Sequence, residues 1–377
     1  AVEEYGMLGI QPECSLGGYM GKRIVLTGGG TAGHVMPIIA LLDELRKEGF
    51  ELHFVGTEDG IEHSLMSRYD DVSYHAVSSG KFRRGLSFGN IKHNFVDVFN
   101  VLKGIKQAKR LIAEIKPDVV FSKGGYVSVP VVMAAKNKAH IVIHECDYTP
   151  GLANKIASRY ADDICVSFED TLDCFKGKGV YTGTPIRREL LSGDRSAGLE
   201  FLDFDGKKPI LLIMGGSLGA KAINDAVTGA MDELVSRFDI VHICGKGKRK
   251  DALENIAGYR QIEFIADELK DVFACTDVML TRAGANAVFE ILSLAIPAIL
   301  VPLPKEVSRG DQLKNAAYFA RKGYSVEVEQ RELDSKRLVD ELTKLYDNRK
   351  KYIAAMTKAD GADAVDRVMD VILKKKG

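Results

Sequence analysis

Three glycine-rich turns are the parts of this sequence best suited to hold a reacting ligand. GGGTAG at 28–33 fits the pattern G-x-G-x-x-G, GGY at 124–126 is a second turn, and GGS at 215–217 is a third. Glycines between a strand and a helix let backbone N–H groups approach an anion at the start of the helix. Any one of these could be an ordinary tight turn. Because the three are spread over two halves of the chain, we expect two phosphorylated ligands to meet in a cleft between domains.

Two side chains beside such turns have the chemistry to act on a ligand. His34 directly follows the first turn at the start of a predicted helix, where the helix dipole lowers the pKa of an imidazole and leaves it able to accept a proton. Glu290 lies in the helix that follows TRAGAN at 281–286. There a carboxylate can accept both hydroxyls of a ribose while the amides of Gly284 and Ala285 hold the adjacent phosphate. The alternatives are a histidine that only caps or packs and an ordinary surface glutamate.

The elements that would position these residues alternate as strand, turn and helix. Short apolar or β-branched runs predict strands at 23–27, 51–56, 72–77, 118–121, 140–143, 163–166, 209–214, 240–243, 261–265, 277–280, 298–301 and 325–328. Helical segments separate the runs, and the segment 360–374 also has helical spacing. This alternation is typical of parallel sheets with helices on both faces. We therefore predict an α/β fold with two doubly wound parallel sheets, each opened by its own glycine-rich turn.

The composition is that of an ordinary globular protein. The 377 residues include 52 Lys plus Arg and 52 Asp plus Glu, so the formal net charge is zero, and 46% of the residues are hydrophobic. Without excess positive charge a nucleic-acid partner is not expected. The six cysteines contain no C-x-x-C pair and are expected to be free thiols. No apolar run is long enough to span a bilayer, and residues 1–19 are interpreted as an extension outside the fold.

The order of its motifs makes the sequence similar to the MurG family, the undecaprenyl-diphospho-muramoylpentapeptide β-N-acetylglucosaminyltransferases. The motifs are GGGTAGHVMP, KGGYVSVP, HECDYTPGLANK, YTGTPIR, GGSLGA, TRAGANAVFE and SRGDQLKNA. The resemblance covers residues 21–375 and implies the GT-B fold, in which two Rossmann-like domains face a cleft. It also implies a lipid I-binding domain at 20–181, completed by the C-terminal helix at 360–377, and a UDP-GlcNAc-binding domain at 182–359.

The resemblance implies an inverting transfer of GlcNAc from UDP-GlcNAc to the C4 hydroxyl of lipid I, giving lipid II, with no metal or other cofactor. His34 would be the candidate base, and Glu290 would hold the ribose. The other substrate-binding residues that it implies are Thr31, Ala32, Gly33, Asp147, Arg187, Ser217, Ile265 (through its backbone), Arg282, Gly284, Ala285 and Gln312. The loop residues near the acceptor and its diphosphate would be Gly30, Gly124, Gly125 and Tyr126.

The sequence departs from the family pattern at four places close to these residues, one of which is Val129, where a glycine follows the second turn in the family. Ala32 stands where a glycine is common, and Cys146-Asp147 stands where many members have Gln-Asn. Asp311 replaces the first residue of a Gln-Gln pair. We expect these changes to affect fine substrate preference and not the class of reaction.

The segment 81–110 combines positive charge with aromatic side chains. It carries eight Lys or Arg residues against the single Asp97, and the residues at its start include Phe82, Arg83, Arg84, Leu86, Phe88 and Lys92. Each basic residue near an anionic leaflet contributes about 1 kcal/mol, and inserted apolar side chains add to this. Since the implied acceptor is lipid-linked, we expect peripheral docking on the anionic, cytoplasmic face of the bacterial plasma membrane. The alternative is a solvated basic helix whose apolar side belongs to the core.

Four other functions stay open on the residues alone. An NAD-dependent oxidoreductase would use the turn at 28–33, with Glu58 or Asp59 as the acidic ligand of the ribose. A UDP-GlcNAc 2-epimerase-like isomerase, or another GT-B glycolipid glycosyltransferase, would share the nucleotide site. A sugar-nucleotide binder without activity would share it too.

The D-x-D sequence at 203–205 is typical of metal-dependent sugar transferases, but it lies in a polar turn before a strand, so we expect no metal there.

Overall fold

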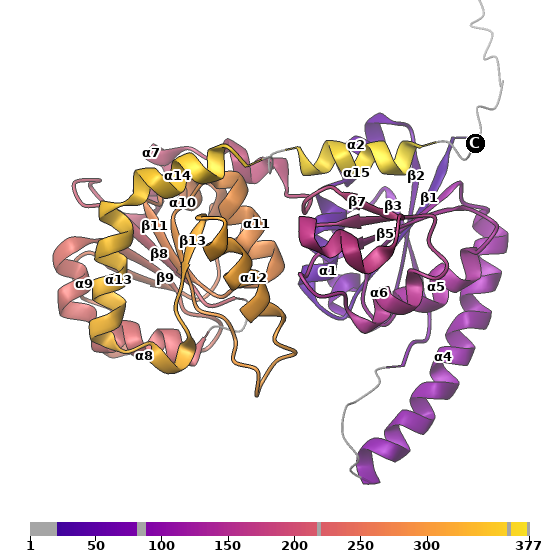
Figure 1. Cartoon of the computed structure of the whole chain (residues 1–377), viewed down its shortest axis with the longest axis horizontal. Helices are drawn as coiled ribbons and strands as arrows, with labels where there is room; N and C mark the ends of the chain where they lie inside the picture. The colour runs from indigo at the N-terminus through magenta and orange to yellow at the C-terminus, as the bar shows by residue number, and fades with distance from the viewer. Residues whose placement is uncertain (1–20, 81–87, 217–219, 360–362, 375–377) are drawn as a thin grey trace, which may run out of the picture.

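The computed structural model describes residues 21–80, 88–216, 220–359 and 363–374, with the backbone alone at 88–100. It contains two sheets with helices on both faces, and each sheet forms the centre of its own domain (Figure 1). All strand pairs in both sheets are parallel. The predicted fold class, with two doubly wound parallel sheets, is therefore confirmed.

The first sheet has seven strands in the order β3-β2-β1-β4-β5-β6-β7. These strands are β1 (Arg23–Gly28), β2 (Glu51–Gly56), β3 (Val72–Ala76), β4 (Val119–Gly124), β5 (His140–Glu145), β6 (Asp163–Val166) and β7 (Gly179–Tyr181). The helices between them are α1 (Ala32–Ile39), α2 (Leu42–Lys47), α3 (Ile61–Met66), α4 (Phe88–Ile115), α5 (Ser128–Ala135) and α6 (Leu152–Ala157).

The second sheet has six strands in the order β10-β9-β8-β11-β12-β13. These strands are β8 (Ile210–Met214), β9 (Asp239–Ile243), β10 (Tyr259–Ile262), β11 (Val278–Thr281), β12 (Ala298–Leu300) and β13 (Ser325–Glu327). Its helices are α7 (Arg195–Leu202), α8 (Lys221–Gly229), α9 (Met231–Arg237), α10 (Leu269–Cys275), α11 (Ala285–Leu294), α12 (Asp311–Arg321), α13 (Ser335–Asp347) and α14 (Arg349–Thr357).

Helices on both faces bury almost every residue of the central strands, which explains their continuous apolar runs. Successive side chains of a strand point to opposite faces. In β1, Ile24 and Leu26 therefore join one core cluster while Val25 joins the cluster on the other face. The second sheet has the same construction, since Leu212 and Leu211 of β8 lie in different clusters.

Helix α15 (Ala364–Leu373) follows the helices of the second domain but packs on the first sheet. Val365, Val368 and Ile372 are buried in the same cluster as Ile24 of β1. In Figure 1 this helix lies over the first domain, while α13 and α14 cover the second. The chain therefore passes between the two domains twice.

Helix α4 is the long element of the first domain, with 28 residues. Its amino-terminal half projects from the body of the molecule, at the lower right of Figure 1. Within the described part of the chain, no helix combines the length and the apolar character needed to cross a membrane. The five cysteines that the structure describes have free thiols, as predicted for them, and Cys14 lies outside the described residues.

Strands β7 and β10 show the clearest differences from the sequence-based prediction. Strand β7 was not predicted, because it has only three partly buried residues at the edge of the sheet and pairs with β6 alone. Strand β10 ends at Ile262 and not at residue 265, because its partner β9 ends at Ile243, the residue that pairs with Ile262. Residues 263–265 pass beyond the end of the sheet, which places Ile265 in a loop at its carboxyl edge.

Candidate active site

The glycine-rich turns follow the central strands of both sheets. The strand order reverses between β1 and β4 in the first sheet and between β8 and β11 in the second. In open α/β sheets, ligands bind beyond the carboxyl ends of the strands at such a reversal. The turns at 28–33 and 124–126 follow β1 and β4, while those beginning at 215 and 282 follow β8 and β11. Each sheet thus offers one binding crevice.

The two turns of the first domain pack directly against each other. Gly30 and Gly125 have φ angles of +86° and +85°, which side chains rarely adopt. A Cβ atom on Gly125 would lie 2.3 Å from the carbonyl oxygen of Gly29, and one on Gly30 would lie 2.6 Å from Cε1 of Tyr126. The structure therefore brings Gly30, Gly125 and Tyr126 together, and only glycine fits at the first two positions.

The buried side chain of Glu62 is a feature of the first turn that the sequence analysis missed. Its carboxylate accepts hydrogen bonds from the N–H of Gly30 at 3.1 Å and from the hydroxyl of Thr57 at 2.6 Å. Burial would raise the pKa of Glu62, but these hydrogen bonds outweigh it and hold that pKa below its usual value. The N–H of Gly30 is therefore engaged within the protein, and the place of this residue near the acceptor stays a prediction. An NAD pyrophosphate would meet the same carboxylate, which argues against the oxidoreductase.

His34 is held in one orientation by the first turn. Its Nδ1 lies 2.9 Å from the carbonyl oxygen of Gly29 and 3.2 Å from the hydroxyl of Thr31. Because a carbonyl only accepts, Nδ1 must carry the proton, and the lone pair of the neutral ring lies on Nε2. Burial lowers the pKa of His34 to about 4, and the charge on Lys123 acts in the same direction. The ring is therefore neutral at pH 7, with Nε2 as its basic atom.

Lys123, at the end of β4, is a second buried charge that the sequence analysis did not single out. Its side chain is only 1% exposed, and among the described residues its Nζ has no hydrogen-bond partner. The positive charge lowers the pKa of His34 and of His144, after the larger effect of burial. It also opposes the effect of burial on Cys146, whose thiol nevertheless has its pKa raised to about 12. Lys123 thus favours a neutral His34 without contacting the cleft surface.

In the second domain, the start of α11 is open for an anion. Gly284 is the N-cap residue and gives the helix no side-chain cap, so its first N–H groups keep their hydrogen-bonding capacity. A Cβ atom on Gly284 would meet nothing within 4 Å, which leaves room for a ligand beside the backbone. Ala285 is the first residue of the helix. The amides predicted to hold a phosphate are therefore uncapped by any side chain.

Glu290 lies on α11 where this helix faces the first domain. With Arg187 it lines a narrow cavity whose other wall includes Met36 and Pro37 of α1. Burial raises the pKa of Glu290 to about 7, although the positive charge of Arg187 acts in the opposite direction. A carboxyl group with this raised pKa is partly protonated near neutral pH. It accepts hydrogen bonds from hydroxyl groups more strongly once it is ionised. Because Glu290 lies at the cleft, the alternative of an ordinary surface glutamate is disfavoured.

Hydrogen bonds close the cleft between the two domains. The Nδ2 of Asn286 on α11 donates to the carbonyl oxygen of Gly33, next to His34, at 3.2 Å. Asp147, after β5, accepts from Nη2 of Arg309 at 3.2 Å and from Nδ2 of Asn315 at 3.3 Å. Arg309 also forms an ion pair with Asp311 at 2.6 Å. Asp147 thus bridges the domains, and its role in substrate binding stays a prediction.

Two predicted binding residues of the second domain, Arg282 and Gln312, have different environments. Arg282 is buried and donates to the carbonyl oxygen of Val301 at 3.0 Å and to Gln330 at 2.7 Å, so its side chain supports the sheet. Gln312 accepts from the N–H of Leu303 at 3.0 Å, which leaves its Nε2 donors for a ligand. Ser217 lies outside the described residues.

In the first domain, Thr31 is the N-cap residue of α1 and Ala32 is its first residue, next to His34. Gly124 is the last residue of β4.

The acidic groups that resemble metal ligands are engaged within the protein. Glu145, Cys146 and Asp147 bring their ligand atoms within 4.8 Å of one another. However, the carboxylate of Glu145 accepts from the N–H groups of Asp147 and Gly151 and from Asn154. These three residues form a hydrogen-bonded loop after β5. The D-x-D carboxylates at 203 and 205 pair with Arg260 and Lys207, and they precede β8 and not one of the glycine-rich turns.

Family models match most of the chain. Residues 24–166 match the glycosyltransferase family 28 N-terminal domain, and residues 210–371 match the glycosyltransferase family 28 C-terminal domain. A protein of Clostridium tetani named UDP-N-acetylglucosamine–N-acetylmuramyl-(pentapeptide) pyrophosphoryl-undecaprenol N-acetylglucosamine transferase is 47% identical over 357 residues, which are 94% of this chain and 98% of that protein. A Clostridium botulinum protein of the same name is 48% identical over 355 residues, 94% of this chain and 99% of its own.

Solved structures show the same architecture. The crystal structure of Acinetobacter baumannii MurG has a TM-score of 0.72 and 27% identity, and the match covers 94% of this chain and all of that one. The calicheamicin glycosyltransferase CalG4 has a TM-score of 0.67 with 13% identity, over 95% of this chain and 100% of that one. At that identity the second likeness supports the fold alone.

Proposed function

This chain belongs to the MurG family within glycosyltransferase family 28 and transfers N-acetylglucosamine to lipid I to give lipid II; from that premise we propose how its domains and residues divide the reaction. The first sheet with α15, within residues 20–181 and 360–377, would form the acceptor domain. The second sheet, within residues 182–359, would form the UDP-GlcNAc domain. The carboxyl edges of the two sheets would then hold the two substrates on opposite sides of the cleft.

The donor would bind along the carboxyl edge of the second sheet. The uncapped N–H groups at Gly284 and Ala285 would receive the diphosphate, because the start of a helix favours negative charge. Glu290 would accept the ribose hydroxyls, and the backbone of Ile265 would contact the uracil edge. The Nε2 donors of Gln312 would contact hydroxyls of the sugar. No metal is needed for this arrangement, since backbone dipoles can stabilise the charge of the departing UDP.

His34 would act as the general base of the transfer. Its Nε2 would take the proton of the C4 hydroxyl of the acceptor as that oxygen attacks the anomeric carbon of GlcNAc. The bond from this carbon to the diphosphate oxygen breaks with inversion, and UDP leaves with the electron pair. The hydrogen bond from Nδ1 to Gly29 fixes the ring so that Nε2 keeps its lone pair.

The contact of Asn286 with Gly33 is the observation that carries this proposal. It joins the helix that would hold the diphosphate to the turn that carries His34, so both substrates would meet at the base. The decisive experiment follows UDP release from UDP-GlcNAc with a short-chain lipid I analogue, with a control that lacks the acceptor. Release that depends on the acceptor supports the proposal. UDP-GlcNAc conversion without acceptor would indicate the epimerase, and no release in any lipid condition would contradict the transfer.

The raised pKa of Glu290 predicts a pH-dependent affinity for UDP-GlcNAc. Burial raises this pKa to about 7 in the free enzyme, and the ribose hydroxyls need the ionised carboxylate as acceptor. We expect kcat/KM for UDP-GlcNAc to fall about tenfold per pH unit below about pH 7 and to level off above it. The measurement is a pH series at saturating acceptor. Glu290→Gln should flatten this limb, whereas an unchanged limb in that variant would assign the titration to another group.

We further propose that the segment 81–110 docks on an anionic membrane at the cytoplasmic face. Its support is the basic and aromatic sequence together with the projecting position of the first half of α4 (Figure 1). Residues Phe82, Arg83, Arg84 and Leu86 lie outside the described residues, and Phe88 and Lys92 lie where only the backbone of α4 is described. A lipid-linked acceptor would require the enzyme to reach the membrane surface.

The docking proposal predicts weak vesicle binding that requires anionic lipid. We expect the Phe82→Ser, Phe88→Ser double variant to lose this binding, because it removes two apolar anchors from a contact in which each basic residue contributes about 1 kcal/mol. Co-sedimentation with phosphatidylglycerol vesicles and with neutral vesicles measures it. Phe201→Ser, at an exposed phenylalanine of α7 in the second domain, is the matched control. Equal binding by the double variant and the unchanged protein would refute the docking surface.

A further inference from the structure

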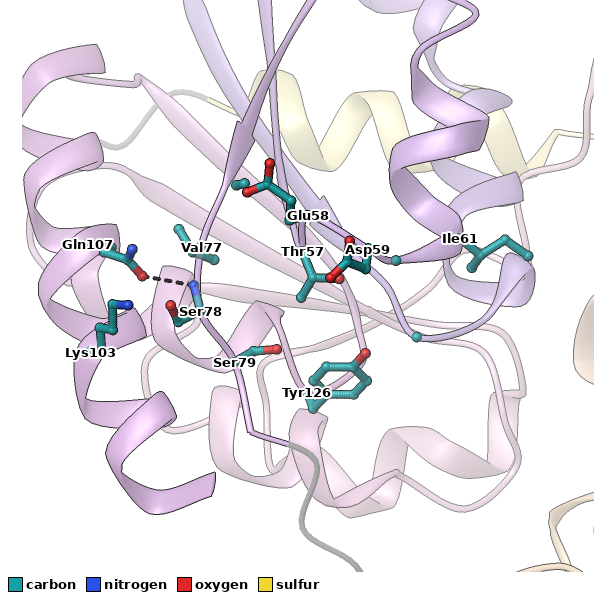
Figure 2. A pocket seen from close by; sticks show the side chains of 13 residues that line it. Thr57, Glu58, Asp59, Ile61, Val77, Ser78, Ser79, Lys103, Gln107 and Tyr126 are labelled. Atoms are coloured by element: carbon teal, nitrogen blue, oxygen red, sulfur yellow. Dashed lines mark hydrogen bonds between the residues drawn. The ribbon is translucent and has the colours of Figure 1, made fainter. Parts of the chain in front are cut away.

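A cavity of about 680 Å³ opens at the carboxyl edge of the first sheet, beside the site described above. Its walls come from the loop after β2, the end of β3 and the facing side of α4 (Figure 2). Of the residues that the family resemblance implies for substrate binding, only Gly30 and Tyr126 line this cavity. Its size is that of a site for a ligand of moderate length.

Opposite charges line opposite walls of this cavity. Glu58 and Asp59 come from the loop after β2, and Lys103 comes from α4 on the other side (Figure 2). Among the described residues none of these three charges has an ion-pair partner. Such an arrangement suits a ligand that carries both an ammonium group and a carboxylate, because each charge would find a partner on one wall.

The polar groups of the cavity are held in fixed positions. Gln107 accepts a hydrogen bond from the N–H of Ser78 at 2.8 Å through its Oε1, which leaves both Nε2 donors for a ligand (Figure 2). On the facing wall, the hydroxyl of Tyr74 donates to the carbonyl oxygen of Thr57 at 2.6 Å. The hydroxyl of Thr57 donates to Glu62, which also holds Gly30. The loop that carries Glu58 and Asp59 is thus anchored to the turn that carries His34.

The cavity does not suit a dinucleotide, although acidic residues after the second strand bind ribose in many such proteins. The pyrophosphate of that ligand would need the N–H of Gly30, which the carboxylate of Glu62 occupies. A linear peptide fits better, because it carries a free carboxylate and backbone groups and can carry an amine. Curated relatives at 47–48% identity are named for an N-acetylmuramyl-(pentapeptide) acceptor. Five extended residues span at most about 18 Å.

We propose that this cavity receives the peptide of the acceptor, with a peptide carboxylate at Lys103 and Gln107 and a peptide amine at Glu58 and Asp59. The inference rests on the proposed function, because it takes the first domain as the acceptor domain. Tyr126 borders both the cavity and the turn of His34, so the sugar and its peptide would occupy one continuous surface. The cavity therefore selects acceptors by their peptide, while the base and the donor site carry out the transfer.

The test compares two short-chain acceptors in solution, one with the pentapeptide and one without any peptide. UDP release by the full chain is followed without vesicles, so that membrane docking plays no part. We expect kcat/KM to be at least about tenfold higher with the peptide, and Lys103→Glu to reduce this preference to less than about threefold. The same variant should leave the KM for UDP-GlcNAc and the rate with the bare acceptor within about twofold. Lys138→Glu, an exposed lysine before β5 at the opposite edge of the sheet, should behave as the unchanged protein.

A second arm tests the acidic wall. The peptide acceptor with a free amine is compared with the same acceptor after acetylation of that amine. We expect acetylation to lower kcat/KM about tenfold in the unchanged protein and to have no effect in the Glu58→Gln, Asp59→Asn double variant. Discrimination that survives in this variant would overturn the assignment of the acidic wall.

The outcomes separate this inference from the proposed function. If the unchanged protein uses both acceptors equally well, or if Lys103→Glu slows both acceptors to the same degree, the peptide site is refuted while the transfer reaction stands. If neither acceptor supports UDP release, the proposed function itself fails. If ADP-ribose inhibits transfer to the peptide acceptor but not to the acceptor without peptide, the cavity is assigned to a nucleotide. That result would also refute the peptide site.

Discussion

Replacing His34 with alanine is expected to lower kcat by about 10²- to 10⁴-fold, the range that general base catalysis contributes. The variant loses Nε2, the basic atom that the Gly29 hydrogen bond leaves with a lone pair. The KM for UDP-GlcNAc should change by less than about threefold, because the donor is held by the other domain. Steady-state UDP release with the lipid I analogue measures both constants.

A second substitution separates the base from a packing role for the same residue. His34→Asn keeps an N–H group able to donate to Gly29 but has no basic nitrogen. Its kcat is expected to be as low as that of the alanine variant, while its thermal midpoint should stay closer to that of the unchanged protein. If His34→Asn kept most of the activity, the proton would have to go to another group, and His34 would be a structural residue of the turn.

Replacing Glu290 with alanine is expected to raise the KM for UDP-GlcNAc by about 10²-fold. Hydrogen bonds to a charged group contribute about 1.5–3 kcal/mol each, so the loss of two ribose contacts accounts for at least this factor. Because the residue is also partly buried beside Arg187, the thermal midpoint of the variant must be measured with its kinetics. A sugar nucleotide that lacks the 2′-hydroxyl gives a sharper readout.

The unchanged enzyme should use the 2′-deoxy donor at least about tenfold less efficiently than UDP-GlcNAc. Glu290→Ala should use both donors equally, because it has no carboxylate to tell them apart. Glu233→Ala, at an exposed glutamate in the first turn of α9, is the matched control and should keep the preference of the unchanged protein. A Glu290→Ala variant that still discriminates between the two donors would place the ribose elsewhere.

The fold could be predicted to a large extent, because doubly covered parallel strands are continuous apolar runs. Strands such as β1, β4 and β8 show no exposed residue, and their burial makes them visible in a single sequence. The same reasoning failed at β7, whose three residues are only partly buried at the edge of the sheet. The end of β10 was misplaced because it is set by the length of the neighbouring β9 and not by its own composition.

The candidate site could be predicted where its residues follow a strand within a few positions. His34, Gly284 and Glu290 can be recognised as candidates in this way. Glu62 and Lys123 cannot, because charged residues are normally exposed and no local pattern shows that these two are buried. The contact of Asn286 with Gly33 is also invisible in the sequence, since it joins residues 253 positions apart.

The departure at Asp147 shows how such distant contacts change an interpretation. From the sequence, this carboxylate stands where an amide is common in the family and is one of the implied substrate-binding residues. The structure instead pairs it with Arg309 and Asn315 across the cleft. Arg309 is shared with Asp311, the other acidic departure, so the two unusual carboxylates use the same cation. Both departures therefore concern contacts between domains.

The placement of α15 sets the order in which the molecule can be completed during synthesis. Val365, Val368 and Ile372 cover part of the first sheet but are translated after the whole second domain. Domains generally fold as the ribosome releases them, the N-terminal one first. Here the domain that is translated first can complete its core only after the second domain has been synthesised, because its last core residues come from α15. The second domain, whose elements β8 to α14 are consecutive, can fold before the first is finished.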